Sequence, residues 1–152
     1  MANTQAMATS FKSDLLIAYH NFGTAPTRAT ATADTFKAAL YLASATVNAS
    51  TTQYSTTNEV VGTGYTAGGV AITAWNAPTT GGTTGYTTPT ASITYTTVTL
   101  TTAFDAVLIY NNTQLNNRAV SVHTFGSQTV TAGTFTLTMP TNNSTSALIR
   151  LA

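Results

Sequence analysis

The second half of the sequence is a series of short stretches in which apolar and polar residues alternate, separated by turn residues. These stretches are 93–100, 104–110, 118–125, 129–131, 135–139 and 147–151. Successive side chains of a strand point to opposite faces, so alternation of this kind predicts strands with one buried face. Many short strands with regularly spaced turn signals are typical of an antiparallel sandwich or barrel. We therefore expect an all-β fold, an antiparallel β-sandwich, and favour a jelly roll because long loops alternate with short ones.

The composition supports a β-rich fold with an unusual surface. Charged residues make up 6% of the chain, whereas about 25% is ordinary for globular domains. The hydrophobic fraction is nevertheless 43%, which is too high for a charge-rich disordered chain. Threonine supplies about a quarter of the 152 residues, and it has a high propensity for strands. The expected surface is therefore polar but uncharged.

Several classes of function are disfavoured by the same composition. The net charge is +1 and the five basic residues are scattered, so we expect no nucleic-acid partner. No apolar run approaches the roughly 20 residues of a membrane helix, so no membrane association is predicted. The first ten residues lack a basic start followed by an apolar core, so we predict no signal peptide. Cysteine is absent, which excludes disulfides and thiolate metal sites.

The stretch 57–73 contains four of the ten glycines, at Gly62, Gly64, Gly68 and Gly69. Glycine adopts backbone conformations that other residues resist, so this spacing predicts a shaped loop. The residues that follow, 70–75, alternate as a strand does. A shaped turn that leads into a strand has a structural role more often than a ligand-binding one, and we favour the structural interpretation.

Other segments are assigned from local pattern. Residues 34–42 fit a strand better than a helix. Residues 78–90 are rich in Gly, Pro and Thr, which predicts a loop. In 93–100 the alternation of apolar and polar residues changes phase near Thr97, which suggests a bulge. The apolar phase of the alternating strands predicts a set of core positions. These are Phe36, Leu40, Ile72, Leu108, Val120, Val122, Phe135, Leu137 and Ile149.

The N-terminal third differs from the rest. Residues 11–22 carry an apolar stripe at helical spacing, which predicts one short helix, and 24–33 read as a linker. We divide the chain into an N-terminal helix and linker arm, 1–33, and a β-sandwich domain, 34–152. The helix either packs on its own sheet or offers its stripe to a partner. The candidate interface residues are Phe11, Leu15, Leu16, Tyr19 and Phe22.

Candidates for catalysis or metal binding are few. The acidic residues are Asp14, Asp34, Glu59 and Asp105, and the histidines are His20 and His123. Acid–base hydrolysis needs paired carboxylates or a nucleophile with a histidine, and the only triad to consider joins His123, Asp105 and a Ser or Thr. We place His20 in the last turn of the helix, and His123 on the face opposite Val120 and Val122, toward solvent or a neighbouring subunit. No clustered metal ligands are visible. We predict no enzyme, no cofactor and no metal.

Several segments resemble small virion proteins of tailed bacteriophages, in particular capsid decoration (cement) proteins. The resemblance rests on residues 34–41, 44–54, 57–69, 117–126 and 129–137, of which the glycine-rich stretch is the most specific. It covers nearly the whole chain after Asp34. Proteins of this family bind outside the mature shell and clamp neighbouring capsid subunits.

The resemblance implies a β-sandwich or jelly-roll body, homo-oligomers and no enzymatic activity. The expected partners are the major capsid protein and copies of the chain itself, as a dimer or trimer. The expected location is the capsid surface of the virion, after assembly in the host bacterial cytoplasm. The alternative is a carbohydrate-binding or adhesin-like tail or fibre module, in which Tyr65, Trp75, Tyr86 and Tyr95 would stack on sugar rings.

Overall fold

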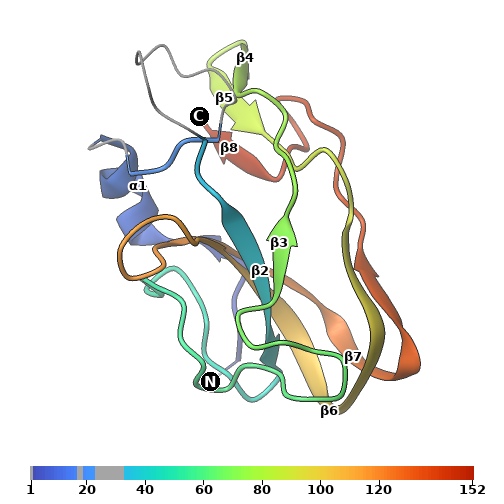
Figure 1. The fold of residues 1–152 in the computed structure, drawn as a ribbon. Coiled ribbons are helices and arrows are strands. Elements are labelled where there is room, and N and C mark those ends of the chain that lie inside the picture. The colour runs from blue at the N-terminus through green and yellow to red at the C-terminus, as the bar shows by residue number, and fades with distance from the viewer. Residues whose placement is uncertain (1, 17–18, 23–32) are drawn as a thin grey trace.

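The computed structural model describes residues 2–16, 19–22 and 33–152, and it is nearly all β. Figure 1 shows one short helix beside the strands. The elements in chain order are β1 (Ala6–Met7), α1 (Thr9–Leu16), β2 (Phe36–Leu42), β3 (Val70–Ile72), β4 (Thr79–Gly81), β5 (Thr84–Thr87), β6 (Ile93–Asn111), β7 (Ala119–Leu137) and β8 (Ile149–Leu151).

The strands form two antiparallel sheets. The larger has the order β1-β7-β6-β2-β3, and the smaller has the order β4-β5-β8. The predicted all-β class, with antiparallel sheets and a short N-terminal helix, is confirmed. The jelly-roll connection stays a prediction.

The strands β6 and β7 dominate the larger sheet. Each has 19 residues, and Figure 1 shows them running side by side around the lower right of the molecule. Their register shifts repeatedly, first between Tyr95 and Val98. The bulge predicted near Thr97 is confirmed, since this residue has a left-handed φ of 53°. Irregular pairing of this kind increases the local bend, so a single pair of strands follows the curved core.

The core follows the alternation of these strands. The predicted core residues Phe36, Leu40, Ile72, Leu108, Val120, Val122 and Ile149 are buried, whereas Phe135 and Leu137 are half-buried against the same cluster. Leu108 is fully buried at the centre of β6, where it pairs with Val122 on β7 and Ala39 on β2. Residues 106–111 of β6 are all buried, so this part of the strand is covered on both faces, which explains the continuous apolar run.

The N-terminal segment is part of the same packed body. In β1, Ala6 and Met7 pair with Val122 and Ser121 of β7. Phe11 of α1 is fully buried, with its ring centroid 6.0 Å from that of Phe22. Residues of the predicted arm therefore contribute both a strand and core side chains.

The predicted helix 11–22 is wrong in its second half. The helix α1 ends at Leu16, and residues 19–22 are not helical. The backbone N–H of Tyr19 donates to the carbonyl of Asp14 at 2.9 Å, a wider turn than an α-helix makes. His20, expected in the last helical turn, instead packs against Phe11 with 4.8 Å between ring centroids. The packing of aromatic rings in the folded protein thus outweighs the weak local preference of residues 19–22 for a helix.

The loop predicted at 78–90 is also wrong, because it contains the hairpin β4–β5. Thr79 pairs with Tyr86, and Gly82 occupies the turn with a φ of 60°. The hairpin is completed by β8, whose Ile149 pairs with Thr87. Pairing with a third strand distant in sequence stabilises a segment that has no apolar alternation of its own.

Candidate functional site

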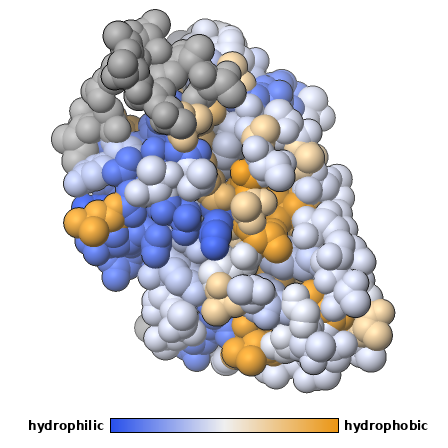
Figure 2. All heavy atoms as spheres, in the orientation of Figure 1, coloured by the Kyte–Doolittle hydropathy of each residue, from blue (hydrophilic) through white to orange (hydrophobic). Residues whose placement is uncertain are grey.

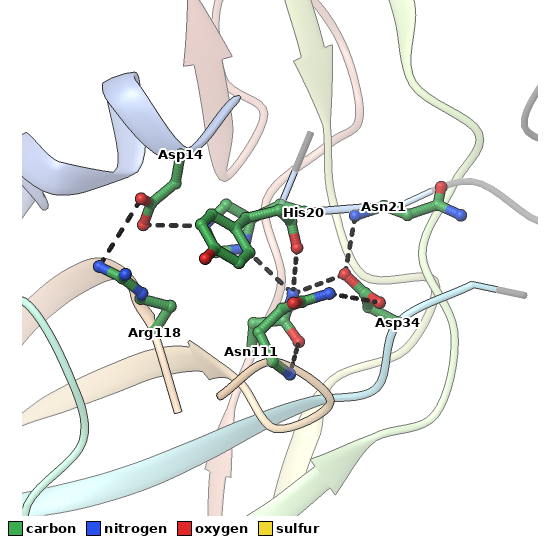
Figure 3. A network of polar contacts seen from close by, with 8 residues as sticks. Asp14, His20, Asn21, Asp34, Asn111 and Arg118 are labelled. Carbon is green, nitrogen blue, oxygen red and sulfur yellow. Dashed lines mark hydrogen bonds and ion pairs between the residues drawn. The ribbon is translucent and has the colours of Figure 1, made fainter. Parts of the chain in front are cut away.

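A buried polar network joins the N-terminal segment to the end of β6 (Figure 3). Its centre is Asn111, which is fully buried. The side-chain Nδ2 donates to the carbonyl of Tyr19 at 3.1 Å and to Asp34 Oδ2 at 2.6 Å, and it lies 3.1 Å from His20 Nδ1. Asn111 Oδ1 accepts the backbone N–H of Thr113 at 3.0 Å. One amide therefore fastens three segments that are distant in sequence.

The charged side of this network is Asp14, which lies between His20 and Arg118 (Figure 3). Asp14 Oδ2 is 3.6 Å from His20 Nε2, and Asp14 Oδ1 is 3.8 Å from an Arg118 guanidinium nitrogen. Burial lowers the pKa of His20, although Asp14 and Asp34 act in the opposite direction. A lowered pKa favours the neutral imidazole of His20 at pH 7. The network joins segments that are distant in sequence, although Asp14 Oδ2 and His20 Nε2 are buried without a hydrogen-bond partner among the described residues.

A second buried cluster surrounds Glu59, which is 4% exposed. Its carboxylate accepts hydrogen bonds from Tyr54 Oη at 2.6 Å, from Tyr65 Oη at 2.7 Å and from the backbone N–H of Gly68 at 2.7 Å. Burial and the adjacent carboxylate raise the pKa of Tyr65, so the phenol stays a donor. Charged hydrogen bonds of this kind are strong. Glu59 thus holds the glycine-rich loop in one shape.

The glycine-rich stretch has the structural role predicted for it. Gly64, Gly68 and Gly69 have left-handed φ angles of 78°, 90° and 69°. A methyl group at Gly69 would overlap the carbonyl group of Ala38 in β2. The predicted strand after the loop exists, but it is shorter, since β3 ends at Ile72.

The histidine considered for catalysis has a serine partner but no carboxylate partner in the described contacts. Ser121 Oγ and His123 Nε2 are 2.9 Å apart. Asp105, the acid of the hypothetical triad, accepts a hydrogen bond from Asn3 instead. Burial lowers the pKa of His123 to about 4, and so weak a base is poorly suited to activating a hydroxyl at neutral pH.

The sequence places His123 toward solvent or a neighbouring subunit. The side chain is half-buried, and whether it meets a neighbouring subunit stays a prediction. His123 lines a cavity of about 420 Å³ together with Met7, Ile149 and Arg150. Residues of the smaller sheet thus line the same cavity as this face of β7, which alternation within one strand does not reveal.

The predicted interface residues are divided between core and cleft. Phe11, Leu15 and Phe22 line an apolar cleft of about 470 Å³, whose other wall includes Tyr86 and Leu151 of the smaller sheet. Tyr19 lies against Arg118, with the guanidinium carbon 5.1 Å from the ring centroid. The side chain of Leu16 lies outside the described residues. Whether any of these residues meets a partner stays a prediction.

The aromatic residues considered for sugar binding are mostly internal. Trp75 is 8% exposed and packs edge-on against Phe22 and Phe36, while Tyr95 is 2% exposed. Tyr65 is held by Glu59, as described above. Tyr86 lines the cleft of about 470 Å³, and Tyr65 and Tyr95 line a smaller cavity of about 150 Å³.

The outer surface carries very little charge. Among residues 2–16, 19–22 and 33–152, the charged side chains in exposed positions are those of Lys12 and Arg150. Much of the face in Figure 2 is pale, with neither strongly hydrophilic nor strongly hydrophobic residues. The described part of the chain has no group of three His, Asp or Glu residues that could hold a metal ion. Nor does that part include a helix long and apolar enough to cross a membrane.

Comparison with known proteins gives no relative. No protein-family model, no curated protein and no solved structure matches this chain.

Proposed function

We propose that this chain is a non-enzymatic structural protein of a bacteriophage particle, which binds the outside of the capsid and clamps neighbouring capsid subunits. The proposal combines the resemblance to capsid decoration proteins with the observation that, among the described residues, the only exposed charged side chains are those of Lys12 and Arg150. A soluble monomer usually keeps its net charge away from zero and its surface charged. Charged residues are depleted at the centre of protein interfaces, so a neutral surface suits a protein that is bound to its neighbours.

The use of the carboxylates supports a structural role. Glu59 and Asp34 accept several hydrogen bonds from the fold, Asp14 faces His20 and Arg118, and Asp105 accepts one from Asn3. Each of the four acidic side chains therefore contributes to holding segments together. In a shell, many copies of a weak neutral contact act together, so no single contact needs to be strong.

The test uses particles of the phage whose genome carries the coding sequence. Particles made after deletion of the gene should contain an intact shell that breaks at a lower temperature than the wild-type shell. Adding the purified chain to these particles should restore the wild-type breakage temperature at a saturable ratio of chain to capsid subunit. Deletion particles as stable as the wild type that take up none of the added chain would overturn the proposal.

A further inference from the structure

Two neighbouring cavities meet at His123 of β7. The first is the cavity of about 420 Å³ described above, and the second has a volume of about 240 Å³. Gln5, His123 and Leu148 line both of them, so the two cavities adjoin at these residues. Small-molecule sites usually have volumes of about 300–1,000 Å³. The two cavities together fall within this range.

The second cavity is mostly apolar. Its hydrophobic lining comes from β6, from β7 and from the segment between β7 and β8, and consists of Ile93, Val107, Ile109, Phe125, Leu137, Met139 and Leu148. The three residues of β6 are buried in the core, and the other four are half-buried against it. Covering such a lining with an apolar group is favourable, because it removes apolar surface from water.

The first cavity is more polar. The side chains of Ser121 and His123 hydrogen-bond to each other at 2.9 Å, and both residues line this cavity. Gln5, Thr84 and Ser144 line it as well. Hydroxyl, imidazole and carboxamide groups can donate or accept hydrogen bonds. This cavity therefore suits the polar end of a ligand whose apolar end lies in the second cavity.

The first cavity also has a cation in its lining. Among the described residues that line the two cavities, Arg150 has the only side chain that is charged at neutral pH, since burial lowers the pKa of His123 to about 4. The Arg150 guanidinium donates to the carbonyl of Thr145, beside Ser144 in the cavity lining. Arg150 forms no ion pair with an acidic residue in the described part of the chain. Such an arginine presents a fork of donors that matches a carboxylate.

We propose that the two cavities form one binding site for a medium-chain carboxylic acid. The carboxylate binds Arg150 and the Ser121 hydroxyl, and the acyl chain passes His123 into the apolar cavity. A single cation matches a head group with one negative charge, and the hydrophobic lining matches an unbranched hydrocarbon chain. This inference goes beyond the proposed capsid role and does not depend on it, because the site needs no partner protein.

The experiment is a titration of the purified chain with sodium octanoate, followed through the NMR signals of the two histidine rings. His123 lies where the two cavities meet, whereas His20 lines the separate cleft of about 470 Å³. We expect the His123 signals to shift in a saturable manner and the His20 signals to stay in place. Hexanoate and butyrate should bind about tenfold more weakly for each two methylenes removed, because they cover less of the apolar cavity.

Changes of the head group and of one side chain test the carboxylate contact. Octylammonium and octanol have the same chain as octanoate, and we expect both to bind more weakly by about tenfold or more. Arg150→Gln should weaken octanoate binding by about tenfold or more and leave octanol binding unchanged. The matched control is Lys12→Gln, which removes the other exposed charge of the described residues, on α1 and outside both cavities. The control should bind octanoate like the wild type.

The inference is overturned if octanoate leaves the His123 signals in place, or if it shifts those of His20 instead. Octylammonium that binds as tightly as octanoate would also overturn it, and this comparison uses the wild-type chain, so it does not depend on the folding of a variant. Unchanged octanoate binding by folded Arg150→Gln would do the same. Since the titration contains no phage particles, none of these results bears on the capsid role, and failure of the capsid role would leave this site in place.

Discussion

At the scale of single residues, the fold depends on a few side chains that serve several segments at once. Asn111 connects the N-terminal segment, the segment before β2 and the β6–β7 loop. Glu59 accepts hydrogen bonds from two tyrosines and from the backbone of Gly68. The residues next to Asn111 and Glu59 in the sequence do not predict which groups hydrogen-bond to them. Their roles follow from tertiary contacts alone, so single substitutions at such positions should have large effects.

Two glycines provide a matched comparison at this scale. Gly69 and Gly82 both have left-handed φ angles, of 69° and 60°. A methyl group at Gly69 would overlap the Ala38 carbonyl, whereas nothing lies within 4 Å of one at Gly82. We expect Gly82→Ala to cost about 1 kcal/mol of unfolding free energy, from backbone strain alone. Gly69→Ala should cost at least about 2 kcal/mol more, measured by urea unfolding. Equal losses would show that the close contact with β2 is not a constraint.

His123 should make the protein sensitive to acid. Burial lowers its pKa to about 4, below the value of about 6.5 expected in the unfolded chain. Between these two values the unfolded chain binds more protons, so the contribution of neutral His123 to stability is complete above pH 6.5 and is lost as the pH falls toward 4. His123→Gln should therefore reduce the loss of melting temperature between pH 7 and pH 4.5. His20, with a pKa lowered in the same direction, accounts for part of the remaining loss.

At the scale of elements, β1 pairs with β7, and α1 packs on the core through Phe11. An eight-residue helix is not stable in water without packing. Its packing is supplied by Phe11, which is fully buried between His20 and Phe22. The N-terminal segment is therefore expected to be essential to the stability of the body.

Phe11→Ala should cost about 3–5 kcal/mol of unfolding free energy, the usual range for removal of a buried aromatic ring. The neighbouring Lys12 is exposed, so Lys12→Ala is the control and should change stability by less than about 0.5 kcal/mol. Chemical denaturation followed by tryptophan fluorescence measures both, because Trp75 packs on Phe22 in the same cluster. A Phe11 variant as stable as the control would mean that α1 is only loosely attached.

The elements that could be predicted from the sequence are those whose pattern is local. The alternation of 93–100 and its phase change at Thr97 gave β6 and its bulge, and the apolar run around Leu108 marked the central strand. The hairpin β4–β5 could not be predicted, because its threonines and glycines show no alternation of apolar and polar residues. Its strand β5 pairs with β8, which is distant in sequence. The helix was predicted too long because the stripe that includes Phe22 serves tertiary packing with Phe36 and Trp75. The partners of Glu59 and Asn111 left no signal in the sequence.

At the scale of the whole molecule, the neutral surface determines how the chain should associate. Among the described residues, exposed charge is limited to Lys12 and Arg150. Salt screens interactions between exposed charges and has little effect on uncharged contacts. We expect the chain to form dimers or trimers whose dissociation constant changes less than about threefold between 50 mM and 500 mM salt. Sedimentation equilibrium measures this, and a change of tenfold or more would point to a charged interface.

The central claim is the proposal that this chain decorates the outside of a capsid. The most direct test is the structure, at residue resolution, of particles purified from the phage whose genome carries the coding sequence. The account predicts copies of this fold on the outer face of the shell, in contact with neighbouring capsid subunits. Particles without this chain, or with it in the tail or inside the shell, would contradict the account.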